Sequence, residues 1–333
     1  MAARPFVGYH APSEQFTPAE LVEFAVAAER AGFDGLSISD HFHPWQENQG
    51  HAGHAWVTLA AIGARTERLE FGTSVTCPIY RYHPAQVAHA FATLAALYPG
   101  RVYLGVGTGE ALNEAVIGDW GPHRERAARL AEAIRLIREL WSGEPVDFDG
   151  RYYQVRGAQL YDPPRPPPPI YVAASGPRSA RLAGREGDGW ITDAGTVRQR
   201  PELREAFLQA AREAGKDAER LPVSVELWVV VGDELEALAG ARLWQFIPIF
   251  GEVVDVSGPR QIQQLAEERS SPERAMEGWL VSEDPVEHIA AIEALAALGV
   301  TRVFIHSPQN DQRRVIDFYG EHVLPALRAK GDG

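Results

Sequence analysis

Short apolar segments alternate with longer amphipathic ones from one end of the chain to the other. A short apolar run is typical of a buried strand, whereas apolar residues spaced three and four apart are typical of a helix. Strands are expected at residues 6–9, 35–39, 69–73, 102–104, 170–172, 189–191, 223–231 and 302–305. Because strands that alternate with helices form parallel βα units, this pattern predicts an α/β fold, a (β/α)8 TIM barrel.

Capping residues and prolines set the expected helix boundaries. Thr17 and Glu20 have the spacing of a capping box, and Pro18 occupies the first helical position. Helices are expected from residue 18 onward and at residues 54–65, 84–98, 124–140, 179–186, 202–214, 284–298 and 315–330. Two less regular stretches, 141–168 and 232–281, are interpreted as insertions near the barrel mouth. Residues 1–333 are therefore predicted to form a single TIM-barrel domain with insertions.

The composition narrows the classes of function. Hydrophobic residues make up 45% of the chain and charged residues 23%, which is ordinary for a globular protein with a buried core. The net charge of −13 would repel a polyanion, so nucleic acid is excluded as a partner. The single cysteine, Cys77, suits a reducing cytosol, and no apolar run reaches membrane-spanning length. We therefore expect a cytoplasmic protein that binds neither membrane nor nucleic acid.

Polar and glycine-rich residues follow several of the expected strands. In a barrel of this type the carboxyl ends of the strands open on one mouth, where the active sites lie. Asp40, His41 and Trp45 follow the second strand. The other candidates are Glu14 after the first strand, residues 74–78 after the third, residues 105–110 with Asn113 and Glu114 after the fourth, and residues 173–177 after the fifth. The convergence of these loops predicts an active site at the mouth.

His41 is the candidate general base. A lone histidine is more often a structural or surface residue, but this one lies between an acid and an indole at a strand end, where a partner can set its tautomer and pKa. Trp45 is interpreted either as core packing or as a surface for a ring or sugar face. His43 is interpreted as part of the turn before Pro44. Because His41 and His43 are two positions apart and no third ligand accompanies them, no metal site is expected.

The turn at residues 105–109 contains three glycines, but it is not a dinucleotide fingerprint. The spacing is Gly-x-Gly-x-Gly, and the strand before it is the fourth rather than the first. Backbone N–H groups in such a turn suit a phosphate or the edge of a planar ring. Ser175 and Gly176, ahead of the helix at residues 179–186, offer a second such turn. Two anion-binding turns at one mouth favour a phosphorylated cofactor.

Several segments of the chain resemble one family. They are Ser39-Asp40-His41-Phe42, residues 72–75, 98–102 and 140–143, and the long run 104–114. These segments resemble the glucose-6-phosphate dehydrogenase group that uses the deazaflavin coenzyme F420, within the luciferase-like superfamily, and the resemblance covers nearly the whole chain. Residues 41–45 and 76–82 also resemble a related alcohol dehydrogenase that uses the same cofactor. The resemblance implies a luciferase-like barrel, usually a homodimer, with coenzyme F420 across its mouth.

The resemblance also implies roles for individual residues. His41 corresponds to the base that takes the hydroxyl proton while hydride passes to C5 of the deazaflavin, Trp45 to a residue that helps to hold the intermediate, and Glu110 to the acid that protonates the cofactor ring. Cofactor-contact positions are matched by Asp40, Ser74, Val75, Thr76, Gly107, Thr108, Gly109, Asn113, Ala174, Ser175 and Gly176. The bond between Ser74 and Val75 corresponds to a non-prolyl cis peptide. Glu14 corresponds to another acid that lines the pocket.

The substrate pocket departs from the family pattern. In the sugar-phosphate enzymes three cationic side chains hold the substrate phosphate, and by alignment Thr196, Val254 and Gly278 take their places here. A phosphate dianion in a partly dry pocket needs charge-assisted partners, so losing all three weakens its binding. We therefore expect an F420-dependent oxidoreductase that oxidises the hydroxyl or hemiacetal carbon of an unphosphorylated sugar or other alcohol.

Three alternatives stay open at the level of sequence. The first is a sugar-6-phosphate dehydrogenase whose phosphate site has been rearranged around Arg198, Arg200 or Arg274. The second is an FMN-dependent luciferase-like monooxygenase, which the fold alone does not exclude. The third is a non-catalytic cofactor carrier, which would leave the cluster around His41 without a purpose.

Overall fold

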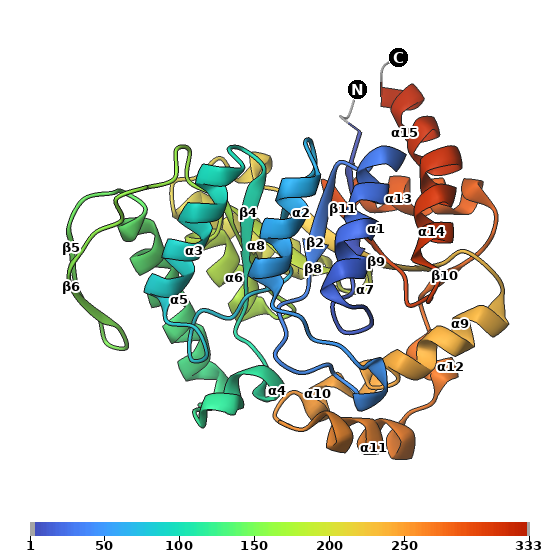
Figure 1. Ribbon diagram of the computed structural model, residues 1–333, viewed down its shortest axis with the longest axis horizontal. Helices are drawn as coiled ribbons and strands as arrows, with labels where there is room; N and C mark the ends of the chain where they lie inside the picture. Colours follow the sequence, from blue (N-terminus) through green and yellow to red (C-terminus); the bar gives the residue numbers. More distant parts are fainter. Residues whose placement is uncertain (1–3, 332–333) are drawn as a thin grey trace.

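A closed barrel of eight parallel strands forms the centre of the protein in a computed structural model, which describes residues 4–331 (Figure 1). In order around the barrel the strands are β1 (Phe6–Ala11), β2 (Gly35–Ile38), β3 (Glu70–Thr73), β4 (Val102–Val106), β7 (Ile170–Ala173), β8 (Gly189–Asp193), β9 (Val223–Val230) and β11 (Arg302–His306). Pairing of β8 with β9 and of β11 with β1 closes the ring. The predicted barrel is confirmed, and a short strand, β10 (Leu280–Val281), pairs with β9 beside it.

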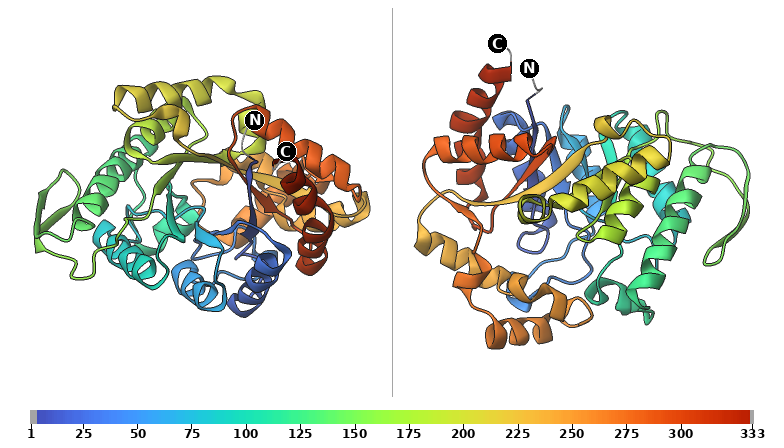
Figure 2. Two further views of the ribbon diagram at one scale, coloured as in Figure 1. Left: turned by 90° about the horizontal axis from the view of Figure 1, so that it is seen from above. Right: turned by 180° about the vertical axis from the view of Figure 1, so that it is seen from behind.

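Helices surround the strands, as the view from above in Figure 2 shows. The larger ones are α1 (Pro18–Ala31), α2 (Ala55–Arg65), α3 (Pro84–Leu97), α5 (His123–Leu140), α6 (Pro177–Glu186), α8 (Pro201–Glu213) and α13 (Pro285–Ala297). The capping box before α1 is confirmed, because Thr17 Oγ1 accepts from the Glu20 N–H and Glu20 accepts from the Thr17 N–H. The single helix expected at residues 315–330 is instead α14 (Gln312–Phe318), a π-helical turn at Tyr319–Val323, and α15 (Leu324–Gly331).

The two irregular stretches adopt different structures. Residues 141–168 contain a small antiparallel hairpin of β5 (Val146–Asp149) and β6 (Gln154–Ala158), which extends from the side of the barrel in Figure 1. The Tyr153 hydroxyl ties it to the loop after β3 by donating to the Ile79 carbonyl at 2.9 Å. That residues 1–333 make up one domain remains a prediction.

Residues 232–281 lie across the end of the barrel opposite the chain termini (Figures 1 and 2). Their helices are α9 (Glu234–Ala241), α10 (Phe250–Val253), α11 (Pro259–Arg269) and α12 (Pro272–Ala275), with 3-10 turns at Arg242–Trp244 and Ile247–Ile249. A separate apolar cluster joins this insertion to Trp45 and Leu112 of the barrel loops. The insertion therefore covers the mouth. Among the described helices, none combines the length and the apolar character needed to cross a bilayer.

Candidate active site

His41 lies just past the carboxyl end of β2 and is almost fully buried. Its Nδ1 is 3.0 Å from the carbonyl oxygen of His43 and 3.3 Å from the Asn113 amide nitrogen; because a carbonyl can only accept, the shorter contact favours the tautomer with the proton on Nδ1 and a lone pair on Nε2. Burial lowers the pKa of His41, and the carboxylate of Glu110 opposes that shift only in part. The imidazole is therefore neutral at pH 7 with a free lone pair, which is the state a general base requires.

Two acids and an amide surround this imidazole. Nε2 of His41 lies 3.5 Å from Glu14 Oε1. The Asn113 amide nitrogen lies 3.4 Å from Glu110 Oε2, and its Oδ1 accepts from the Phe42 N–H at 2.8 Å. Asn113 and Glu110 belong to α4 (Ala111–Glu114) and its N-cap, so the amide fastens the loop after β2 to the loop after β4. The structure thus brings together four of the residues predicted from sequence.

Glu14 is a buried carboxyl group with a shifted pKa. It is 1% exposed, and burial raises its pKa to about 7 although Ser39 Oγ donates to its Oε2 at 3.1 Å. A carboxyl group that titrates near neutrality can exchange protons with an imidazole at little cost in free energy. Glu14 therefore lies beside His41 as a second group able to hold a proton.

Asp40 is fixed by Thr76, Arg81 and Tyr82, three donors on the loop after β3. Thr76 Oγ1 donates to Asp40 Oδ2 at 2.6 Å, and the Arg81 guanidinium donates to Oδ1 at 3.2 Å. Glu114 accepts the Arg81 backbone N–H at 2.9 Å, and burial raises the pKa of Glu114 to about 7. Trp56 Nε1 donates in turn to Thr76 Oγ1 at 3.0 Å. Arg81 was not predicted as a site residue, although it lies within the 76–82 segment that carries the resemblance.

Trp45 forms the wall beside the imidazole. The Trp45 and His41 ring centroids are 5.3 Å apart, and Trp45 stacks on Phe246 at 4.6 Å with an interplanar angle of 17°. Phe250 meets the indole edge-on at 5.5 Å. The indole is part of the apolar cluster under the insertion, which agrees with core packing, and it also lies beside the candidate base. Its role as a surface for a ring or sugar face stays a prediction.

The glycine-rich turn after β4 packs against the loop after β3. The Ser74–Val75 peptide bond is cis, as the resemblance implied. A Cβ on Gly107 would lie 2.6 Å from Val75 Cγ2, and Gly109 has a φ of +70°, so both positions require glycine. The Gly107 N–H donates to the Thr76 carbonyl at 3.0 Å. Gly107 thus lies directly against Val75, whereas Gly109 packs against Cys77 and Glu114.

The second turn lies at the next strand of the barrel. β7 pairs with β4, and α6 begins immediately after Ser175 and Gly176. The Ala174 carbonyl accepts from Trp190 Nε1 at 2.8 Å, and the Ser175 carbonyl accepts from Arg200 at 2.8 Å. Around Gly176 a Cβ would meet only Ser179 Oγ, at 3.8 Å, which leaves open space beside the start of α6.

The three residues at the family's phosphate-binding positions lie on separate segments. Thr196 is in α7 (Ala194–Gln199), where its hydroxyl donates to Asp193 Oδ2 at 2.5 Å. The Val254 carbonyl accepts from the Ala111 N–H at 2.9 Å, which joins α10 to α4. Gly278, between α12 and β10, is exposed with a φ of +85°.

The structure gathers three further polar residues that the sequence analysis missed. His10, Glu226 and His306 come from β1, β9 and β11, and their side-chain nitrogen and oxygen atoms lie within 4.8 Å of one another. Burial lowers the pKa of His10 and of His306 to about 3. The local signal was weak, since β9 and β11 also contain the polar residues Ser224 and Arg302.

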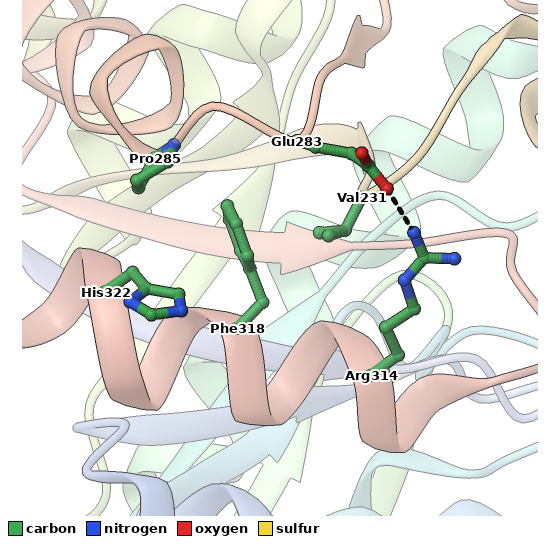
Figure 3. A pocket seen from close by; sticks show the side chains of 6 residues that line it. All are labelled: Val231, Glu283, Pro285, Arg314, Phe318 and His322. Atoms are coloured by element: carbon green, nitrogen blue, oxygen red, sulfur yellow. Dashed lines mark hydrogen bonds and ion pairs between the residues drawn. The ribbon is translucent and has the colours of Figure 1, made fainter.

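A cavity of about 330 Å³ lies away from His41, between the end of β9 and helices α13 and α14 (Figure 3). Its one arginine, Arg314, pairs with Glu283 at 2.5 Å and with Glu236 at 2.6 Å. The lining side chains in Figure 3 include none of the residues predicted for the site. This cavity is therefore separate from the candidate site at the mouth.

Comparison with known proteins yields close relatives. Residues 1–302 match the model of the luciferase-like monooxygenase family. An F420-dependent hydroxymycolic acid dehydrogenase of Mycobacterium tuberculosis is 50% identical, over 97% of this chain and 88% of that protein. An F420-dependent glucose-6-phosphate dehydrogenase of Nakamurella multipartita is 46% identical, over 97% and 96%. Among solved structures, an F420-dependent secondary alcohol dehydrogenase in complex with an F420–acetone adduct is 34% identical, with a TM-score of 0.91 over 98% and 99% of the two chains. The chain belongs to the luciferase-like monooxygenase family.

Proposed function

We propose that this protein is an F420-dependent dehydrogenase that oxidises the hydroxyl or hemiacetal carbon of an unphosphorylated sugar or other alcohol. The observation that carries the proposal is the state of His41, a buried imidazole with a lowered pKa just past the end of β2, whose Nε2 lies 3.5 Å from Glu14 Oε1 and whose ring lies beside Trp45. The relatives named above, each an F420-dependent dehydrogenase, support the same reaction class.

The residues around the mouth fit the deazaflavin cofactor. Val75 packed against Gly107 offers a flat surface that suits a planar ring, and the open space at Gly176 beside the start of α6 suits a phosphate group. We assign the cofactor contacts to Asp40, Ser74, Val75, Thr76, Gly107, Thr108, Gly109, Asn113, Ala174, Ser175 and Gly176. Coenzyme F420, when bound, accepts the hydride from the alcohol carbon, so the carbon is oxidised and the deazaflavin reduced by two electrons.

The side chains of the protein accept and donate the protons of the reaction. His41 takes the hydroxyl proton at Nε2, while the Nδ1–H bond to the His43 carbonyl keeps the ring in the correct tautomer. Trp45 closes one side of the reacting centre and excludes water from it. Glu110, held by Asn113, is the acid on the opposite loop that delivers a proton to the cofactor ring.

The substrate is proposed to lack a phosphate. Thr196 is hydrogen-bonded to the carboxylate of Asp193, and an acid at this position repels an anion. Two of the three arginines that could restore the charge already have partners, since Arg200 donates to the Ser175 carbonyl and pairs with Glu202, and Arg274 donates to a backbone carbonyl. A neutral sugar or alcohol therefore suits the pocket better than a phosphate ester.

A cofactor titration followed by a substrate screen tests this function. Binding of F420 is measured first, and loss of its visible absorption is then followed with glucose, glucose 6-phosphate and simple secondary alcohols. We expect turnover with an unphosphorylated compound, falling only at pH values below the ordinary histidine pKa of 6.5 because the pKa of His41 is lowered. A clear preference for glucose 6-phosphate would refute the substrate assignment. Oxygen consumption with reduced FMN would instead indicate a monooxygenase.

We further propose that the enzyme is a cytoplasmic homodimer. The one cysteine, Cys77, is free and buried, which suits a reducing compartment. The dimer rests on the family resemblance, and light scattering of the purified protein, which should give twice the chain mass, tests it.

A further inference from the structure

A continuous line of polar contacts leads from His41 into the barrel. Glu14 Oε1 lies 3.5 Å from His41 Nε2, and Glu14 Oε2 accepts from Ser39 Oγ at 3.1 Å. Ser39 Oγ lies 3.3 Å from His10 Nε2, and His10 Nδ1 lies 3.1 Å from Glu226 Oε1. Each link joins an oxygen to a nitrogen or another oxygen, so a proton can pass along the whole line.

The line is buried along most of its length and opens at its far end. Glu14, Ser39 and His10 are at most 5% exposed, whereas the Glu226 side chain is 24% exposed. Glu226 also borders a small interior cavity of about 10 Å³ together with Ser37 and Ser224, which is room for about one water molecule. Glu226 is therefore the point at which a proton can leave the line.

We propose that Glu14, Ser39, His10 and Glu226 form a relay that carries the substrate's hydroxyl proton away from His41 after hydride transfer. This inference rests on the proposed dehydrogenase function and extends it to residues outside the mouth. His41 and three of the relay residues belong to the carboxyl ends of β1 and β2 or to the loops after them, and Glu226 belongs to β9.

The proton is conserved at each step of the relay. The His41 imidazolium gives its Nε2 proton to Glu14 Oε1, and rotation of the protonated carboxyl group turns this O–H toward Ser39, whose hydroxyl stops donating to Glu14 and accepts the proton. Ser39 gives its own proton to His10 Nε2 while His10 releases its Nδ1 proton to Glu226, so His10 never holds an extra proton for long. The net result is a neutral His41, one proton on Glu226 that exchanges with water, and a His10 ring protonated on Nε2; rotation of the Ser39 hydroxyl and of the His10 ring then restores the starting arrangement.

Neighbouring groups suit these directions of transfer. Burial makes Glu14 titrate near neutrality, with a pKa of about 7, so it accepts and returns a proton readily. Glu226 faces His10, His306 at 3.5 Å and the carboxylate of Asp193, and burial raises its pKa, which helps it to accept a proton. Ser37 Oγ, 2.8 Å from His10 Nδ1, is a side branch of the line.

Two substitutions interrupt the relay and one tests the side branch. His10→Phe replaces the central imidazole with a ring of similar size, and Glu226→Gln keeps the shape of the last side chain without its proton affinity. Ser37→Ala is the matched control, because it removes the other partner of the same His10 nitrogen. Titration with F420 shows that each variant is folded, and Glu226→Gln serves alone if His10→Phe does not bind the cofactor.

Two signals recorded together in a single turnover separate the steps. The cofactor's absorption reports hydride transfer, and a pH-indicator dye in weak buffer reports release of the proton. We expect His10→Phe and Glu226→Gln to transfer hydride within about twofold of the wild type, because His41 still takes the first proton, and to release the proton at least about tenfold more slowly. Ser37→Ala should match the wild type in both signals.

Each outcome bears on a different claim. Proton release as fast as wild type in both relay variants, with hydride transfer intact, would overturn the relay and leave the dehydrogenase function standing. Absence of any absorption change in the wild type, whatever the alcohol, would overturn both. A stoichiometric metal ion in the purified protein that is lost in His10→Phe would overturn the relay, because His10, Glu226 and His306 would then be its ligands.

Discussion

The barrel interior has an aromatic end and a polar end, and burial acts differently on the charged groups at each. Near the amino termini of the strands, the Arg302 guanidinium lies 3.9 Å from the centre of the Phe6 ring and pairs with Glu70 at 2.7 Å. Burial opposes the charge of Arg302, but Glu70 together with Tyr171 and Tyr103 outweighs burial, so the pKa of Arg302 is raised. At the carboxyl end, burial dominates, so His10 titrates at about 3 and Glu14 at about 7.

The pKa shifts at the two ends differ because the buried groups have different charged partners, not because they are buried to different depths. A paired charge packed among Phe6, Tyr103, Tyr171 and Phe304 is fixed in one protonation state, which serves stability. At the mouth the Arg81–Asp40 pair is likewise charged, whereas His10 and Glu14 are held neutral or near their titration point, which serves proton transfer. Substitutions at the two ends should therefore separate activity from stability.

The largest expected effect is on activity at the polar end. His41→Ala removes the base, so turnover should fall by about 10³-fold, within the range usual for general-base catalysis. Cofactor binding and the thermal midpoint should change little, since the side chain donates only to a neighbouring loop carbonyl. Steady-state rates and a parallel F420 titration measure both, and a variant that retains turnover would remove His41 from the mechanism.

At the aromatic end we expect the opposite result, a loss of stability with activity retained. Phe304→Ala leaves a cavity among Phe6 and Tyr103, which should lower the free energy of unfolding by about 3–4 kcal/mol. At a temperature where the variant is folded, kcat should stay within about threefold of wild type. Denaturant unfolding and steady-state kinetics test the pair. A large loss of kcat without loss of stability would contradict the division between the two ends.

A smaller effect concerns the pH dependence of stability. Because the pKa of Glu14 is raised to about 7 on folding, its favourable contribution is complete below about pH 4.5 and is lost as the pH rises through 7. Glu14→Gln does not titrate, so its stability relative to wild type should increase by at most about 3 kcal/mol between pH 5 and pH 8. Unfolding curves at the two pH values measure it. A difference that is independent of pH would show that Glu14 is ionised throughout.

The smallest effect is expected at the wall beside His41. Trp45→Phe keeps an aromatic ring but loses part of the stack on Phe246, a contact worth about 1 kcal/mol. We expect kcat/KM to fall by about fivefold with little change in stability. A loss as large as that of His41→Ala would mean that the indole does more than pack.

The sequence predicted the elements of the barrel well and the polar interior poorly. Strands and helices were recovered because their periodicity and caps are local, as at Thr17 and Glu20. His41, Trp45 and Glu110 were found because they follow strand ends next to recognisable motifs. His10, Glu226 and His306 were missed because their meeting depends on the pairing of β9, β11 and β1, which no local pattern specifies. The broken C-terminal helix was missed for the same reason, since its π-helical turn shows no local signal.

The most direct test of the central claim is a crystal structure of the protein with F420 and an alcohol or its ketone product. We predict that the deazaflavin packs on Val75 and that the substrate oxygen lies about 3 Å from His41 Nε2, within hydrogen-bond reach. A cofactor bound away from the mouth, or a substrate oxygen beyond the reach of the imidazole, would contradict the account.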